Sequence, residues 1–217
     1  MDNIRNLYII GSGGFGREVA WLVSRINDCV PTWNLIGFLD DDKKKHGTFM
    51  DGYPVVGGID LLKDLEEDTF VVCAVGAAKV RNKIIDRLKH FSHIQYATLI
   101  DPSVIISNRV TIGEGTIICA GTIITVDVEI GKHVIINLDC TVGHDVMVGD
   151  FVTLYPSVNV SGMVSVGECT ELGTGTQIIQ AKNIGKQSII GAGSVVIRDI
   201  PDSCTAVGNP AKVIKSI

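Results

Sequence analysis

The sequence lacks several features that would place it in common functional classes. No apolar run approaches the ~18 residues of a membrane-spanning helix, and the start, Met1 to Arg5, does not read as a signal peptide. Its six cysteines include no C-x-x-C pair. We therefore expect a cytoplasmic protein with free thiols and no membrane span. The formal net charge of −5 argues against nucleic acid as a partner.

The sequence also lacks the residue groupings that are typical of zinc enzymes and of enzymes with a serine or cysteine nucleophile. A zinc enzyme needs several ligands close together, and no second histidine pairs with His144 in that way. No serine or cysteine has an obvious base beside it. We therefore expect neither a metal nor an acyl-enzyme intermediate.

A six-residue repeat dominates the second half of the chain. Every sixth residue from Ile100 to Val196 is Ile, Val or Leu, and the fifth position of each hexad is small or β-branched except at Lys182. Glycine follows the first position at a spacing of 18, at Gly113, Gly131, Gly149, Gly167 and Gly185. An unbroken period of six predicts an all-β parallel β-helix, with three hexads to each triangular coil. We assign residues 98–217 to this domain, including a C-terminal cap.

Residues 1–97 predict an α/β domain of the Rossmann type. A strand at 7–10 precedes G-x-G-x-x-G, and helical spacing runs from Arg17 to about Ile26. In this context the glycines permit a tight turn and let the backbone approach a phosphate at the helix N-terminus. The strand predicted at 35–39 ends in acidic residues, and the strand predicted at 69–76 ends in glycine. The expected nucleotide-binding residues are Gly11, Ser12, Gly13, Gly14, Phe15, Gly16, Asp40, Asp41 and Gly76.

The remaining elements complete half of a dinucleotide-binding fold. We expect a turn at 53–58, a short helix at 59–65, an amphipathic helix at 79–90, and a last strand at 93–97. A dinucleotide needs two βαβαβ halves, so this domain would hold one nucleotide rather than NAD. Two alternatives stay open. In one, the domain binds no ligand and only packs, and in the other, Asp40 belongs to a solvated turn and does not contact a nucleotide.

His144 is the histidine that the pattern singles out. It lies at the third position of its hexad, next to Asp145 and seven residues after Asn137. A histidine held by a carboxylate or an amide beside a groove is the arrangement of a general base. Spacing alone leaves open a surface histidine without a role.

The motifs together resemble one family. Ile10 to Val19, Gly37 to Asp41, Asn137 with Gly143-His144-Asp145, and Gly208 to Lys212 resemble the hexapeptide acyltransferases. The branch they resemble has two domains and modifies nucleotide-activated amino sugars and sialic acids. The resemblance covers nearly the whole chain. It implies a left-handed β-helix, a homotrimer with acyl-CoA in a groove between subunits, and a uridine diphosphate-sugar on the N-terminal domain.

The resemblance also implies roles for individual residues. His144 would take a proton from the acceptor, with Asp145 and Asn137 orienting it, although relatives often have Glu at the position of Asp145. Gly162, one coil later, would bind the oxyanion through its N–H. Thr153 stands where several members carry a second histidine. Acetyl-CoA, the donor, would contact Gly162, Gly191, Ala192, Pro210, Ala211 and Lys212.

We therefore predict an acetyl-CoA-dependent N-acetyltransferase in bacterial surface-glycan biosynthesis. Its acceptor would be a UDP-linked 4-amino-deoxy sugar whose amine attacks the thioester directly. One alternative is O-acetylation of a sialic acid or its CMP form. A non-catalytic trimeric scaffold that binds a nucleotide-sugar is the alternative from another class, and the acyl chain length stays open.

Overall fold

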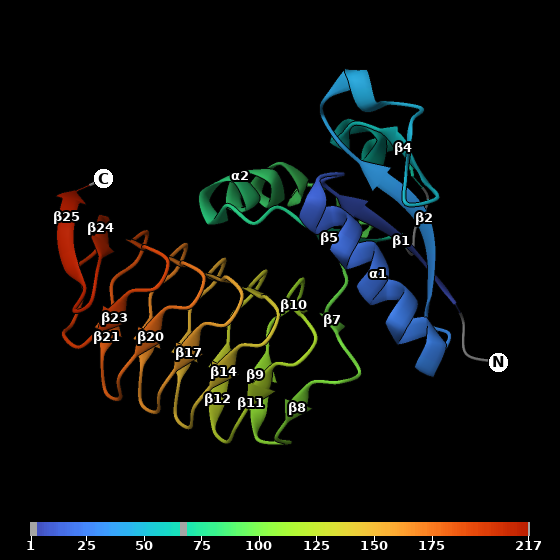
Figure 1. The fold of residues 1–217 in the computed structure, drawn as a ribbon. Coiled ribbons are helices and arrows are strands. Elements are labelled where there is room, and N and C mark those ends of the chain that lie inside the picture. Colours follow the sequence, from blue (N-terminus) through green and yellow to red (C-terminus); the bar gives the residue numbers. More distant parts are fainter. Residues whose placement is uncertain (1–3, 66–68, 217) are drawn as a thin grey trace. The chain divides into compact units, whose positions relative to one another are not determined.

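A computed structural model describes residues 4–65 and 69–216 and divides the chain into two compact units (Figure 1). The first contains Met1–Gly76 and Val80–Pro102, and the second contains Ala77–Lys79 and Ser103–Ile217. The start that we read as lacking a signal peptide includes residues 1–3, which lie outside the described residues, as does residue 217 of the predicted β-helix domain. No helix within the described ranges is long and apolar enough to cross a membrane.

The first unit is built on a six-stranded sheet with the order β3-β4-β2-β1-β5-β6. All neighbours pair in parallel except β3, which is antiparallel to β4. The helices α1 and α2 follow β1 and β5. In chain order the elements are β1 (Arg5–Ile10), α1 (Gly14–Cys29), β2 (Trp33–Leu39), η1 (Lys43–Lys45), β3 (Phe49–Met50), β4 (Tyr53–Gly57), η2 (Ile59–Asp64), β5 (Thr69–Cys73), α2 (Ala78–Leu88), β6 (Ile94–Tyr96) and β7 (Leu99–Ile100).

Two local predictions in this unit were wrong. The segment predicted as a turn at 53–58 forms β4, because Val55 is fully buried and pairs with Phe38. The helix α1 begins earlier than Arg17, since Gly13 already has the extended N-cap conformation and Gly14 is helical. It also runs on to Cys29, three residues beyond the predicted end.

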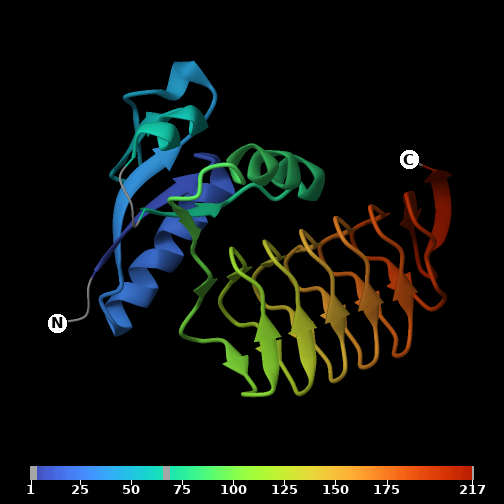
Figure 2. The same cartoon turned by 180° about the vertical axis from the view of Figure 1, so that it is seen from behind.

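The second unit is the three-sided parallel β-helix that the hexads predict (Figures 1 and 2). We name its three faces A, B and C. Face A contains β10 (Ile117–Ile118), β13 (Ile135–Ile136), β16 (Thr153–Leu154), β19 (Glu171–Leu172), β22 (Ile189–Ile190) and β24 (Cys204–Val207). Face B contains β8 (Ile105–Ile106), β11 (Ile123–Ile124), β14 (Thr141–Val142), β17 (Asn159–Val160), β20 (Gln177–Ile178) and β23 (Val195–Val196). Face C contains β9 (Val110–Ile112), β12 (Val128–Ile130), β15 (Met147–Val148), β18 (Ser165–Val166) and β21 (Asn183–Ile184).

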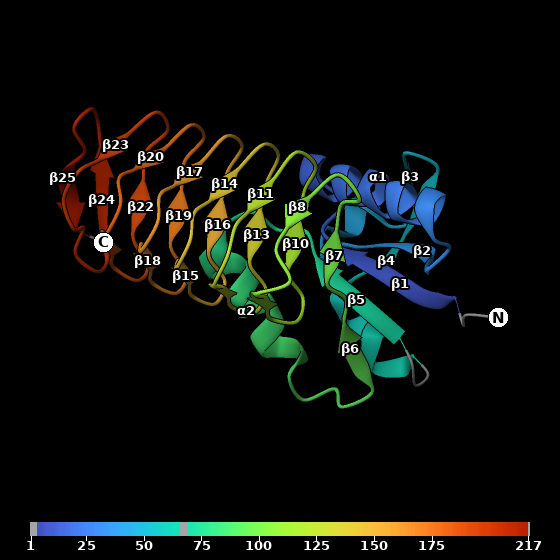
Figure 3. The same ribbon diagram turned by 90° about the horizontal axis from the view of Figure 1, so that it is seen from below.

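Strands pair with the strand one coil later in a register of 18 residues, except that β22 pairs with β24 in a register of 16. Ile118 lies opposite Ile136 on face A, for example, and face A is seen strand by strand in Figure 3. The aliphatic first positions fill the interior, as at Ile136 and Leu172, which are fully buried. The fifth positions pack beside them, and Thr116 and Ser188 are fully buried as well. From Thr116 onward the repeat therefore builds its core from these two positions of each hexad, except at the partly buried Lys182.

The open end of the solenoid is covered by a hairpin. The last strand, β25 (Lys212–Ser216), is antiparallel to β24. The turn between them is anchored by the N–H of Ala211, which donates to the carbonyl of Val195 at 2.8 Å. This hairpin lies in the segment that we predicted as a cap from the loss of the hexad phase.

Candidate active site and nucleotide-binding cavity

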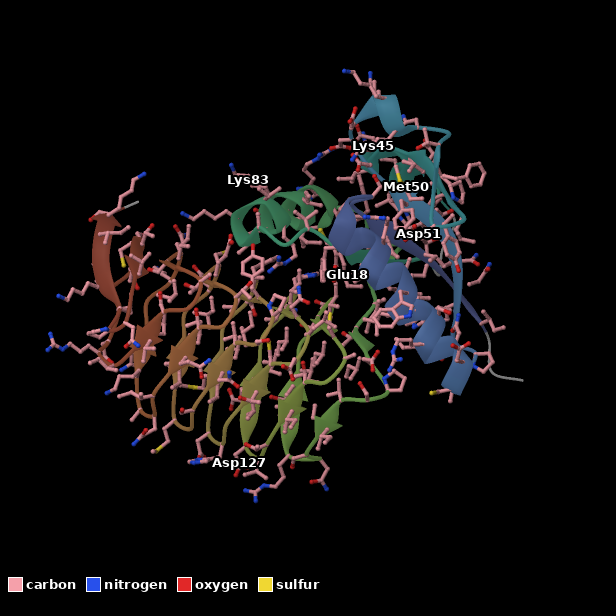
Figure 4. All side chains as sticks on the ribbon, viewed as in Figure 1. Glu18, Lys45, Met50, Asp51, Lys83 and Asp127 are labelled. Atoms are coloured by element: carbon pink, nitrogen blue, oxygen red, sulfur yellow. The ribbon has the colours of Figure 1, made fainter. Side chains whose placement is uncertain are left out.

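The candidate base lies at a corner of the β-helix. His144 and Asp145 follow β14, where the chain turns from face B to face C. Asp145 is the corner residue with a left-handed backbone, φ 57°, as are Asp127 one coil earlier and Met163 one coil later. Asp127 marks this edge of the solenoid in Figure 4. Both side chains are exposed, at 56% for His144 and 59% for Asp145. The corner geometry therefore presents the pair to solvent.

The two side chains form a dyad. His144 Nδ1 lies 2.7 Å from Asp145 Oδ2. A carboxylate only accepts hydrogen bonds, so the proton of the neutral imidazole belongs on Nδ1. That tautomer leaves the lone pair of Nε2 free, and a free lone pair is what a general base needs.

Gly162 lies directly beneath the His144 ring. A Cβ atom built on Gly162 would lie 2.5 Å from both Cε1 and Nε2 of His144. The ring thus occupies the volume that a side chain at position 162 would fill. The N–H of Gly162 donates to no other group among the residues that the structure describes. The predicted base and the predicted oxyanion donor are therefore neighbours.

Asn137 lies at a different corner. It follows β13, where face A turns into face B, and its Oδ1 accepts a hydrogen bond from the N–H of Leu138 at 2.7 Å. Within the described chain it makes no hydrogen bond to His144. Gly191 and Ala192, predicted to contact CoA, follow β22 at the same kind of corner as Asn137. A Cβ on Gly191 would lie 2.7 Å from Val207 Cγ1 of the cap, so the hairpin itself requires this glycine.

Other predicted contacts lie apart from His144 as well. Pro210, Ala211 and Lys212 belong to the cap, where Asn209–Pro210 is a cis peptide and Lys212 begins β25. Thr153 lies on face A and is 1% exposed. It therefore does not share the exposed corner with His144.

The glycine loop after β1 has the geometry of a tight strand-to-helix turn. Gly11 has φ +99°, a region that side chains disfavour. A Cβ on Gly16 would collide with the carbonyl oxygen of Gly11, so the start of α1 packs on the loop as predicted. Gly13 and Gly14 have nothing within 4 Å of a built Cβ. These two positions are open to a ligand, and Phe15 between Gly14 and Gly16 is partly exposed.

Asp40 is tied to this loop. Its Oδ2 accepts from the N–H and the hydroxyl of Ser12 and from Lys45 Nζ, and Ser12 is 3% exposed. Burial disfavours ionisation of Asp40, but the hydrogen bonds from Lys45 and Ser12 outweigh it and hold its pKa well below the ordinary value. The carboxylate therefore fixes the loop at the end of β2.

A cavity of about 380 Å³ opens at the carboxyl ends of β1, β2 and β5. Parallel α/β sheets bind ligands at the carboxyl ends of their strands, at the point where the strand order reverses. Here that point is β1, which lies between β2 and β5. Its charged residues are Asp40, Asp41, Lys83 and Arg87. Its other lining residues are Ile10, Gly11, Leu39, Ile59, Val75, Val80 and Ile84. An apolar slot with a few charged groups is typical of small-molecule sites.

Asp41 and Arg87 form an ion pair at this cavity. Arg87 Nη1 donates to Asp41 Oδ2 at 2.7 Å, and the N–H of Ile59 donates to Oδ1 at 3.0 Å. Burial alone would raise the pKa of Asp41, but the hydrogen bonds from Arg87 and Ile59 lower it overall. Lys83 and Arg87 were missed from the sequence, although α2 carries a lining stripe at helical spacing: Val80, Lys83, Ile84 and Arg87.

Gly76 has a structural contact instead. Its carbonyl and that of Val75 accept hydrogen bonds from Nη1 of Arg81, whose side chain is 1% exposed. Gly76 is absent from the cavity lining. Its predicted contact with the nucleotide is therefore not part of this cavity.

Neither a metal centre nor a reactive thiol is apparent in the described ranges. There is no group of three or more His, Cys, Asp or Glu side chains that would hold a metal ion in residues 4–65 and 69–216. None of the six cysteines, all of which lie in the described ranges, forms a disulfide, and Cys29 alone of the six is exposed. Burial raises the pKa of Cys73 to about 12 and that of Cys140 to about 11, so these thiols are poor nucleophiles.

Comparison with known proteins gives the family. Residues 6–88 match the family model of the PglD N-terminal domain. The UDP-N-acetylbacillosamine N-acetyltransferase of Bacillus subtilis (strain 168) is 41% identical over 119 residues. That match covers 53% of this chain and 51% of the relative, so it spans about half the length of each.

Solved structures match over almost the whole chain. The acetyltransferase domain of PglB from Neisseria gonorrhoeae FA1090, in complex with acetyl coenzyme A, is 31% identical with a TM-score of 0.89 and covers 98% of this chain and 100% of its own. PerB from Caulobacter crescentus, in complex with CoA and GDP-perosamine, is 34% identical with a TM-score of 0.87, covering 98% and 99%. The predicted fold class is confirmed. The chain belongs to the two-domain hexapeptide-repeat acyltransferases, which join a PglD-type N-terminal domain to a left-handed β-helix.

Proposed function

We propose that the protein transfers the acetyl group of acetyl-CoA to the amine of a UDP-linked 4-amino-deoxy sugar in bacterial surface-glycan biosynthesis. The observation that carries the proposal is the exposed His144–Asp145 dyad with Gly162 beneath its ring. The names of the relatives support N-acetylation, since one is a UDP-N-acetylbacillosamine N-acetyltransferase and another, PerB, is in complex with CoA and GDP-perosamine.

His144 acts as the general base in the proposed reaction. Its Nε2 lone pair takes a proton from the sugar nitrogen as that nitrogen attacks the thioester carbonyl. Asp145 holds the Nδ1 proton and stabilises the imidazolium that forms. The new N–C bond replaces the C–S bond, and the proton held by His144 passes to the departing CoA thiolate, which leaves as the thiol.

Gly162 supplies the oxyanion contact. The tetrahedral intermediate carries negative charge on the former carbonyl oxygen, and an N–H without another acceptor can bind it. Direct attack is supported by the cysteines, because the five buried thiols are not accessible as acyl carriers. No acyl-enzyme is needed.

The nucleotide would bind to the first unit. The open loop positions Gly13 and Gly14 at the start of α1 would receive the diphosphate, and the cavity beside Asp40 and Asp41 would receive the nucleoside. Ser12 and Gly16 shape the loop, whereas Gly11 also lines the cavity and would contact the nucleotide.

A homotrimer accounts for the distribution of the remaining residues. His144 and Gly162 lie at the corner between faces B and C, whereas Asn137, Gly191 and Ala192 lie at the corner between faces A and B. One groove includes both sets if adjacent copies supply one corner each. CoA would then run from Gly162 of one copy toward Gly191, Pro210 and Lys212 of its neighbour. Six cysteines without a disulfide and the acyl-CoA donor support a cytoplasmic location.

A thiol-release assay with acetyl-CoA tests the proposal. The acceptors are UDP-, dTDP- and GDP-linked 4-amino sugars, and free and CMP-linked sialic acids. Fast release with a UDP-amino sugar, lost in His144→Ala, is the expected result. Release with a sialic acid alone would replace the proposal by O-acetylation. CoA binding without release on any acceptor would favour the non-catalytic scaffold.

A further inference from the structure

A further groove, of about 460 Å³, lies on the first unit apart from the cavity that we propose for the nucleotide. We call it the α1 groove. The crossovers from β1 to β2 and from β5 to β6 run in opposite directions along the sheet, so right-handed connections place α1 and α2 on opposite faces. The two sites share no lining residue. The α1 groove is lined by Arg17, Ala20, Trp21 and Ser24 of α1 and by Asp51 and Tyr53 of the β3–β4 hairpin.

Trp21 is the apolar surface of the α1 groove. The four lining positions of α1 are three and four residues apart, so they share one face of the helix. The indole is 54% exposed, which is unusual for so large an apolar group. The guanidinium of Arg25 lies over the ring, 5.2 Å from its centroid, and donates to the buried Asp101 at 2.6 and 3.0 Å. Arg25 thus fixes one face of the indole and leaves a rigid apolar surface.

Polar groups surround this surface. Asp51 and Gly52 have φ 47° and 86°, as a type I′ hairpin turn requires. The turn, labelled at Asp51 in Figure 4, places Asp51 Oδ1 3.9 Å from Nη1 of Arg17, which is too far for a hydrogen bond. The two charges compensate each other, yet the carboxylate oxygens and the guanidinium N–H groups stay available. Ser24 and Tyr53 add two hydroxyl groups that make no hydrogen bond to a described residue.

This lining suits a neutral polyol with one apolar face. The charges of Arg17 and Asp51 cancel, so the groove attracts neither an anion nor a cation overall. A cationic ligand is also disfavoured at Trp21, because Arg25 already lies over the ring. A pyranose presents C–H groups on one face and hydroxyl groups around its edge. The C–H face suits the indole, and adjacent hydroxyl groups can donate to a carboxylate and accept from a guanidinium.

We propose that the α1 groove binds a neutral pyranose, with the sugar ring on Trp21 and two adjacent hydroxyl groups between Asp51 and Arg17. The groove gives the enzyme a carbohydrate contact outside its active site. It is separate from the acceptor site of the proposed function and does not depend on it.

Proton–nitrogen NMR of the full chain tests the proposal through the indole N–H signals of its two tryptophans. Trp33 is only 8% exposed and serves as the internal reference. The methyl β-glycosides of glucose, galactose and N-acetylglucosamine are the probes. At least one should shift the Trp21 signal saturably, with a dissociation constant on the order of 1–10 mM, and leave the Trp33 signal in place. A Trp21 signal that no glycoside shifts overturns the proposal, as does tighter binding of inorganic phosphate or tetramethylammonium.

Variants separate recognition from folding. Trp21→Ala should abolish the saturable binding, followed by saturation-transfer NMR of the glycoside. Asp51→Asn keeps a residue that tolerates the left-handed backbone, and it should weaken binding about tenfold because a charged acceptor becomes neutral. The matched control is Asp86→Asn, which removes a carboxylate from an exposed ion pair with Lys89 on α2 and should bind as the wild type. Unchanged affinity in both Trp21→Ala and Asp51→Asn contradicts the proposal.

UDP distinguishes the α1 groove from the acceptor site. The affinity for the glycoside should change by less than about twofold when UDP is added, because the two sites share no residue. Displacement of the glycoside by UDP would assign the groove to the acceptor and overturn a separate site. Trp21→Ala should also retain the wild-type rate of thiol release, whereas His144→Ala loses it, so the proposal and the acetyltransferase activity fail independently.

Discussion

The imidazole of His144 occupies the space in which a side chain of Gly162 would lie, with a built Cβ 2.5 Å from both Cε1 and Nε2. The two residues are 18 residues and therefore one coil apart, and the strands before them, β14 and β17, pair in that register. The absence of a side chain at Gly162 therefore determines where the ring of the base can lie. In the proposed mechanism the same residue also binds the oxyanion.

Substitution of Gly162 by alanine should displace the His144 ring and lower kcat by about 10²-fold, the scale expected for misplacing a catalytic group by about 1 Å. Stopped-time thiol release at saturating substrates measures this. The matched control is Gln180→Ala, one further coil along the same corner and exposed, which should retain the wild-type kcat. A Gly162→Ala enzyme as fast as the wild type would show that the ring position does not matter.

The glycine loop allows a paired test of structure and binding. Gly16→Ala should destabilise the protein by ~3 kcal/mol, because its Cβ would collide with the Gly11 carbonyl. Gly13 has φ −77° and free space around it, so Gly13→Ala should unfold at the same urea concentration as the wild type. In Gly13→Ala the new methyl group should still raise KM for the nucleotide sugar and leave KM for acetyl-CoA unchanged. Equal stability of the two variants would refute the packing argument.

Asp40 should make the stability of the protein depend on pH. Its pKa is lowered in the folded state from an ordinary value of 3.8, so its stabilising effect is present above pH 3.8 and disappears as the pH falls through the lowered value. At pH 7, Asp40→Asn should reduce the free energy of unfolding by about 1–3 kcal/mol, the range for hydrogen bonds to a charged group. Urea unfolding at pH 7 and pH 3 should show the difference shrinking at the lower pH. Asp64→Asn, at an exposed position, serves as the control.

The cysteines give a chemical test of direct transfer. Cys29 is the exposed thiol, and the other five are buried, so a thiol reagent at pH 8 should titrate one group in the native protein and six after unfolding. Alkylation of Cys29 should leave kcat unchanged, because Cys29 at the end of α1 has no part in the mechanism. Loss of activity on alkylation would point to a thiol intermediate.

The β-helix and the His144–Asp145 pair could be predicted from the sequence, because both follow from local repetition. The register of 18 predicted that Gly162 stacks on His144. The same repeat also separates Asn137 from His144. The two residues are seven positions apart, which is one hexad plus one residue, and because each hexad forms one side of a coil they lie at successive corners. Asn137 could therefore have been assigned to another corner, or to another copy, without a structure.

The cavity that we propose for the nucleotide was predicted only in part. The glycine loop and Asp40 follow a known motif, whereas Lys83 and Arg87 lie in a helix whose approach to β1 and β2 depends on the strand order of the sheet. Their helical spacing was visible in the sequence. Which face of α2 meets the cavity is a tertiary property, and the sequence pattern does not specify it.

The most direct test of the account is the kcat of His144→Ala with acetyl-CoA and a UDP-linked 4-amino sugar. The account predicts a fall of ~10²–10⁴-fold, the usual contribution of a general base, while acetyl-CoA still raises the melting temperature of the variant. A variant that binds acetyl-CoA and turns over at a near wild-type rate would contradict the assignment of His144.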